Sequence, residues 1–211
     1  MEKMSFGPIW DEIQKVRKNE GFEKAIQLAN SYIAKDPTNV EPYLQLVDMY
    51  YLMGELEKAE KPIDFILAKD IHHPGVDKAV FYYLKALLLA ERTEWDKAID
   101  YIKQALKLWW DNPEYRRVLA MVEYRRWNKN KWYQLIKELI EDKLIDADVI
   151  LDAVTMALWL WYVDDVKEFI NLYFENQDKI SFFSKPKSYY DKKFQALKNA
   201  FLSSESNEWT K

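Results

Sequence analysis

Apolar side chains recur along much of the chain at intervals of three and four residues, which is the period of an α-helix with one buried face. In the clearest stretch Tyr43, Leu46 and Tyr50 follow this interval, Gly54 interrupts it, and a second helical pattern starts near Glu57. Glycine has no Cβ atom and commonly ends a helix. The pattern therefore predicts two helices joined by a tight turn.

A short sequence of turn residue, apolar residue, acid, lysine and alanine occurs three times, as GFEKAIQLAN, GELEKAEKPI and TEWDKAIDYI. Its alanines are Ala25, Ala59 and Ala98, which lie 34 and then 39 residues apart. A period of this length is typical of stacked two-helix units, each of which buries its apolar face only against its neighbours. We expect these alanines to be spacers that let the helices approach closely.

The second copy carries a recognisable pattern, with Tyr43, Leu46, Tyr50, Gly54 and Ala59 at successive intervals of three, four, four and five residues. With these residues the chain resembles the tetratricopeptide repeat family. The resemblance covers about residues 6–113 and weakens beyond them. The first and third copies contribute Ala25, Ala29, Pro37, Tyr82, Leu89, Trp95, Ala98, Ala105 and Leu106.

This resemblance and the helical periodicity predict an all-α protein, a right-handed α-solenoid of stacked helix-turn-helix hairpins with a C-terminal capping helix. We expect a single superhelical domain over residues 1–211. Its hairpins are predicted at about 6–37, 40–71, 79–111, 113–143 and 147–176, and its cap helix at about 188–202.

The resemblance also implies a function, because in this family the first helix of each hairpin lines a concave groove that holds peptides. The matching positions make this groove apolar and aromatic, so a non-enzymatic adaptor that binds a protein or peptide segment on the concave groove is expected. The chaperone-tail type of groove is disfavoured, since its basic sites carry Trp10, Gln14, Gln45, Val80 and Leu84 here. The expected groove residues are Trp10, Gln14, Arg17, Leu44, Asp48, Tyr51, Tyr83, Leu87 and Ala90.

Two explanations remain open for the apolar first helices. The stretch AVFYYLKALLLAE is apolar nearly all round, so Tyr83 and Leu87 need a cover. Either a partner covers them, or a tight superhelical curl or the C-terminal segment of the chain does. The stretch from 148 to 162 is expected to be one helix, on which Trp159 and Trp161 point in different directions.

Two further functions are alternatives. One is a self-associating scaffold, a homo-oligomer in which the exposed faces of 109–161 stack on a second copy through Trp109, Trp110, Trp127, Trp132, Trp159 and Trp161. The other is nucleic-acid binding through the mixture of basic and aromatic residues at 116–137, because such mixtures can contact single strands. Its cations would be Arg116, Arg117, Arg125, Arg126, Lys129 and Lys131.

The composition of the chain argues against several other classes of function. The chain has 211 residues, 49% of them apolar, a net charge of −4 and no cysteine, so thiolate chemistry is excluded and nucleic acid is not a favoured partner. The two histidines, His72 and His73, are adjacent and lack the spacing of a structural metal site. We therefore expect no catalysis, no cofactor and no metal.

Targeting signals are weak. The longest apolar run, at 153–163, is too short to cross a bilayer, so no direct membrane insertion is expected. The amino terminus lacks the apolar core of a signal peptide. A cytoplasmic location is expected, with an anchor or signal outside these residues left open.

Overall fold

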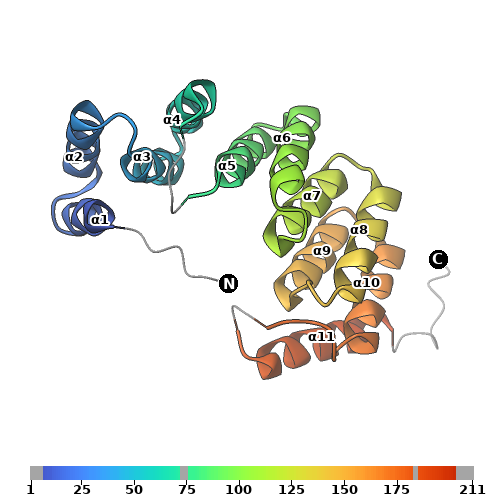
Figure 1. Ribbon diagram of the computed structural model, residues 1–211. Coiled ribbons are helices and arrows are strands. Elements are labelled where there is room, and N and C mark those ends of the chain that lie inside the picture. Colours follow the sequence, from blue (N-terminus) through green and yellow to red (C-terminus); the bar gives the residue numbers. More distant parts are fainter. Residues whose placement is uncertain (1–6, 72–75, 183–184, 203–211) are drawn as a thin grey trace. The chain divides into compact units, whose positions relative to one another are not determined.

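The computed structural model describes residues 7–71, 76–182 and 185–202, and eleven α-helices lie within them. Figure 1 shows these helices in chain order. The predicted all-α class is confirmed. The helices are α1 (Pro8–Glu20), α2 (Phe22–Lys35), α3 (Glu41–Leu52), α4 (Leu56–Lys69), α5 (Lys78–Glu91), α6 (Trp95–Leu108), α7 (Pro113–Arg125), α8 (Lys129–Glu141), α9 (Ala147–Trp159), α10 (Val163–Glu175) and α11 (Lys187–Phe201).

Neighbouring helices pack as hairpins: α1 on α2, α3 on α4, α5 on α6, and α9 on α10. The chain forms two compact units, one ending at Trp127 and the other beginning at Asn128. The first unit contains α1 to α7, and the second contains α8 to α11. The expectation of one superhelical domain over the whole chain stays a prediction.

The first unit packs its helices closely against alanines. Ala25, Ala59 and Ala98 of the repeated sequence are fully buried, as their spacing predicts, and so are Ala29 and Ala105. Ala25 and Ala29 belong to one cluster with apolar side chains of α1 and α3, so α2 touches both helices through them. Small side chains at these positions bring the helix backbones together.

The turns after α3 and after α5 share one backbone conformation. Gly54 has a φ of 73°, its N–H donates to the Tyr51 carbonyl at 2.9 Å, and the next N–H, of Glu55, donates to the Tyr50 carbonyl at 2.9 Å. This pair of bonds satisfies the last carbonyls of a helix and suits a glycine. Thr93, the turn residue that begins the third copy of the repeated sequence, has a φ of 61° and takes the same role.

The second unit is closed by aromatic side chains. Trp132 of α8 meets Phe169 of α10 edge to face, with ring centroids 4.4 Å apart, and Tyr173 of α10 stacks on Phe194 of α11 at 3.8 Å. The Tyr190 hydroxyl of α11 donates to Asp148 of α9 at 2.7 Å. The expected cap helix thus lies over α10 and is tied to α9.

Candidate functional site

The first helices of the first two hairpins are joined by a row of polar contacts. The Gln14 side chain donates to the Gln45 side chain at 2.9 Å, and the Arg17 guanidinium pairs with Asp48. At the start of α1, the backbone N–H of Trp10 donates to the Glu41 carboxylate at 3.3 Å. Each pair lies 31 residues apart, so the row follows the stacking of α1 on α3.

Because of this row, fewer of the expected groove side chains in the first two hairpins are accessible to a partner. Gln14 is engaged with Gln45, and Arg17 is engaged with Asp48, across α1 and α3. Leu44 is buried, with 7% of its surface exposed, and Trp10 packs against the core around it. Tyr51 is 45% exposed and is the accessible aromatic side chain of the expected set on these two helices.

In the third hairpin one of the expected groove residues, Tyr83, is held by α7. The Tyr83 hydroxyl donates to the Glu114 carboxylate at 2.9 Å, and the Tyr83 ring lies 5.1 Å from that of Tyr115. Burial, together with the negative charge of Glu114, raises the pKa of Tyr83 far above its usual value. Leu87 is half-buried and Ala90 is buried.

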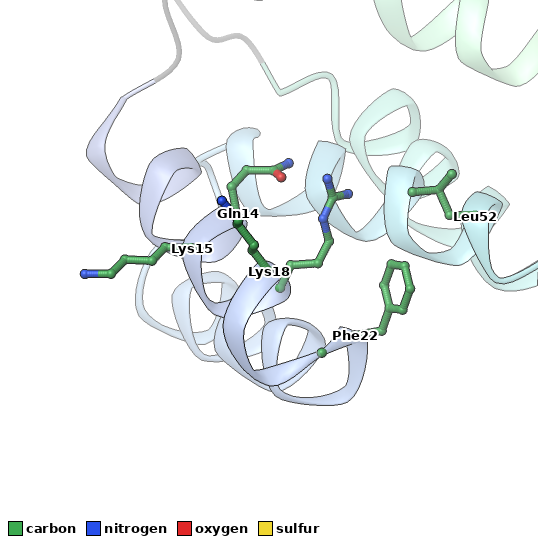
Figure 2. Close-up of a pocket in the computed structure, with 7 residues that line it drawn as sticks. Gln14, Lys15, Lys18, Phe22 and Leu52 are labelled. Carbon is green, nitrogen blue, oxygen red and sulfur yellow. The ribbon is translucent and has the colours of Figure 1, made fainter.

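An open pocket of about 670 Å³ lies beside this row, at the α1–α2 turn and the end of α3. In Figure 2 the side chains of Phe22 and Leu52 lie on one side of it, whereas Lys15 projects away from them. Phe22 is 36% exposed and Leu52 is 58% exposed. The residues lining this Phe22–Leu52 pocket are Gln14, Lys15, Arg17, Lys18, Gly21, Phe22 and Leu52.

Sequence reasoning named two of these lining residues, Gln14 and Arg17, and missed the two apolar ones. Phe22 and Leu52 flank hairpin turns, where the helical pattern does not say which way a side chain faces. Leu52, Tyr51 and Met53 are consecutive and all exposed, which puts three large apolar side chains at the end of α3. This run of three large apolar residues directly before Gly54 was the sequence feature that could have indicated an exposed apolar surface there.

A second exposed apolar surface lies in the second unit, at the turn between α9 and α10. Trp159 is 83% exposed, Trp161 is 88% exposed and Val163 is 46% exposed; we name Trp159–Val163 the tryptophan turn. The expectation of one helix to 162 is wrong here, because α9 ends at Trp159. Trp161 has a φ of 60° and occupies the position that Gly54 holds in the second hairpin.

The other tryptophans of the expected self-association surface divide between surface and core. Trp109, Trp110 and Trp127 are 47%, 73% and 58% exposed. Trp132 is 4% exposed and belongs to the aromatic core of the second unit. The α8 tryptophan is therefore a packing residue.

The expected polyanion patch is largely occupied by carboxylates. Within the first unit Arg117 pairs with Glu114 at 2.9 Å and Arg126 pairs with Asp96 at 3.1 Å, while Arg125 lies 3.8 Å from Glu91. Within the second unit Lys129 pairs with Asp165 at 2.9 Å. Arg116 is half-buried and Lys131 is exposed.

The described residues carry little other chemistry. They contain no group of three or more histidine, aspartate or glutamate side chains placed to hold a metal ion. The adjacent histidines His72 and His73 lie outside the described residues. Among helices α1 to α11, none combines the length and the apolar character that crossing a bilayer requires.

Solved structures with a similar arrangement of helices are tetratricopeptide repeat proteins. A tetratricopeptide repeat protein from Parabacteroides merdae superimposes with a TM-score of 0.67 at 15% identity, over 95% of this chain and 78% of its own. The fold of this chain is thus the tetratricopeptide repeat fold, which confirms the resemblance at the level of the fold. At the level of sequence, neither models of protein families nor curated proteins give a match.

Two further structures support the same fold. MamA is 20% identical with a TM-score of 0.62, over 83% of this chain and 98% of its own. YrrB, described as a tetratricopeptide repeat protein with an unusual peptide-binding site, is 14% identical with a TM-score of 0.59, over 84% of this chain and 89% of its own. These identities are too low to carry more than the fold.

Proposed function

We propose that this protein is a non-enzymatic adaptor that binds a segment of another protein on its first unit. The observation that carries the proposal is the exposed apolar end of α3, Tyr51 to Met53, beside the Phe22–Leu52 pocket. Contiguous exposed apolar surface on a soluble protein usually marks an interaction site. The tetratricopeptide repeat fold commonly serves as a protein-binding scaffold, and the unusual peptide-binding site of YrrB gives an example at the level of the fold.

The energy available fits a transient complex. Burying a large apolar side chain contributes about 1.5–3 kcal/mol, and a few such anchors must offset the entropy lost on association. Because Gln14 and Arg17 are already held by Gln45 and Asp48, these polar side chains need little ordering when a partner binds. Micromolar affinity for a peptide is therefore expected, at about −8 kcal/mol.

The test selects peptides from a random phage-displayed library on the immobilised protein and measures their affinity by fluorescence anisotropy. Tyr51→Ala should weaken binding about tenfold, because it removes an exposed aromatic anchor. Tyr83→Ala should have a smaller effect, since Tyr83 is already held by Glu114. Unchanged affinity in both variants, with their thermal stability intact, would remove this site from the proposal.

A second candidate function is self-association through the tryptophan turn. Trp159 and Trp161 are almost fully exposed, and large aromatic side chains are enriched at the centres of protein interfaces. Light scattering after size exclusion, over a wide range of concentration, measures the mass. A dimer that dissociates in the Trp159→Ser, Trp161→Gly double variant supports this candidate, whereas a constant monomer excludes it.

No comparable observation supports nucleic-acid binding. Four of the six cations expected to form the patch, Arg117, Arg125, Arg126 and Lys129, face carboxylates of their own unit. Counterion release, which drives binding to phosphates, needs cations that are free to replace those counterions. We therefore take protein segments, and not nucleic acid, as the partner class.

A further inference from the structure

We propose that the Phe22–Leu52 pocket binds an acidic peptide segment by taking up one bulky apolar side chain while the basic side chains around it contact flanking carboxylates. This inference deepens the proposed function and rests on it. The pocket shares Gln14 and Arg17 with the expected groove and reaches from them to the turn between α1 and α2. The inference therefore extends the groove to this turn and assigns a chemical class of partner.

The apolar part of the pocket consists of two side chains from different hairpins. Phe22 is the first residue of α2 and Leu52 is the last residue of α3, and both are substantially exposed. Figure 2 shows them on the same side of the pocket. A side chain such as phenylalanine or leucine placed against them would remove apolar surface from water on both partners.

The polar part of the pocket is positively charged. Its lining includes the basic residues Lys15, Arg17 and Lys18. No lining residue among those that the structure describes has a carboxylate side chain. Arg17 is paired with Asp48, so the lysines supply the net charge at the edge. Lys15 lies on the side away from Phe22 and Leu52, so residues that flank the inserted apolar side chain reach it by extending across the pocket, and carboxylates on that flank are favoured electrostatically.

The geometry favours a peptide over a polyanion. A nucleic acid gains affinity from many phosphates contacted in a row, and this pocket offers only a small basic group on a chain with a net charge of −4. The paired apolar side chains require a ligand with an apolar group next to its charges. An acidic peptide with one aromatic or leucine residue has both.

The test records amide nuclear magnetic resonance shifts of the isotope-labelled full chain during titration with three synthetic peptides. The first has one phenylalanine flanked by glutamates, the second replaces the phenylalanine with serine, and the third replaces the glutamates with lysines. We expect saturable shifts at 14–22 and at Leu52 with the first peptide only. These shifts should shrink as salt is added, because exposed charges are screened.

Two sets of variants locate the contact. Lys15→Glu with Lys18→Glu should weaken the first peptide about tenfold, as should Leu52→Ser. The matched control reverses two exposed lysines of α6, Lys103→Glu with Lys107→Glu, and should leave affinity unchanged. Dispersion of the amide spectrum shows that each variant is folded.

The results separate this inference from the proposed function. Absence of localised shifts with the glutamate peptide, or equal shifts with the lysine peptide, overturns the acidic-partner inference. If phage-selected peptides still bind through Tyr51 in that case, the adaptor function stands without this pocket. If neither the synthetic nor the selected peptides bind, both proposals fail.

Discussion

The two compact units stabilise the same kind of helical hairpin in different ways. In the first unit, fully buried alanines such as Ala59 and Ala98 let helices approach closely. In the second unit the buried alanines, among them Ala147 and Ala157, are confined to α9, and large aromatic side chains such as Phe169, Tyr173 and Phe194 fill the space between α8, α10 and α11. Because both interiors are close-packed, a larger side chain at a buried alanine should destabilise the first unit. Removing a buried aromatic ring should destabilise the second unit.

The two units also differ in the residue at the turn inside a hairpin. Gly54 and Trp161 occupy equivalent positions with left-handed backbone, at φ values of 73° and 60°. Glycine adopts this conformation without steric cost, whereas in tryptophan the Cβ atom makes it unfavourable. The side chain of Trp161 is also 88% exposed. The tryptophan turn is therefore kept at a cost in stability, which is common where a residue serves binding.

The largest effect is expected from removing an aromatic ring in the second unit. Phe194→Ala should lower the free energy of unfolding by about 3–5 kcal/mol, because Phe194 is fully buried against Tyr173. Hydrogen exchange read by mass spectrometry should show the loss first in segments after Asn128. Tyr189→Ala, at an exposed ring of the same helix, is the control. Equal loss of protection in both units would contradict the comparison.

The complementary change adds volume to the first unit. Ala59→Leu should destabilise the protein by about 1–3 kcal/mol, since a larger side chain forces apart helices that meet at a fully buried alanine. Thermal unfolding measures it, with Ala34→Leu at an exposed position of α2 as control. A neutral Ala59→Leu would mean that the helices have room there.

Exchanging the turn residues should give effects of opposite sign. Trp161→Gly should raise the free energy of unfolding by about 1 kcal/mol, as it relieves the left-handed strain, and Gly54→Ala should lower it by a similar amount. Chemical denaturation measures both changes. Trp127→Gly, at a φ of 70°, repeats the test at another turn. A less stable Trp161→Gly variant would show that the tryptophan contributes packing.

The smallest effect concerns a charge cluster of the first unit. Burial opposes ionisation of Glu60, but Lys85 and Arg92 outweigh it and lower the pKa of this carboxyl below its usual 4.5. Its ionised form therefore stabilises the link between α4 and α5 above that value, and the stabilisation is lost as pH falls through the lowered pKa. The melting temperature should fall less on acidification in Glu60→Gln than in the wild type. An identical acid dependence in both would exclude this contribution.

The local structure was readable from the sequence because its signals are local. The repeated alanines and the interval from Tyr43 to Gly54 each reflect which side of a helix is buried. The position of Thr93 already matched the turn glycine of the other copies, and the structure gives it the same conformation. The helix to 162 failed because a tryptophan at a left-handed position carries no turn signal.

The candidate site was readable only in part. The matched positions included Gln14 and Arg17, which line the Phe22–Leu52 pocket. They did not reveal that Gln45 and Asp48 engage these side chains, or that Leu44 is buried. Those facts depend on the stacking of α1 on α3, between residues about thirty positions apart.

The helices, the hairpins and the class of fold could be predicted from the sequence, because periodicity, turn residues and small spacers act within a few turns of chain. Which apolar side chains remain in water depends instead on how the helices pack. Phe22, Leu52 and Trp161 are as apolar as the buried Phe194, and what separates them is whether a neighbour distant in sequence covers them. Burial is a property of that packing, so the surfaces available for binding emerge only when the helices are assembled.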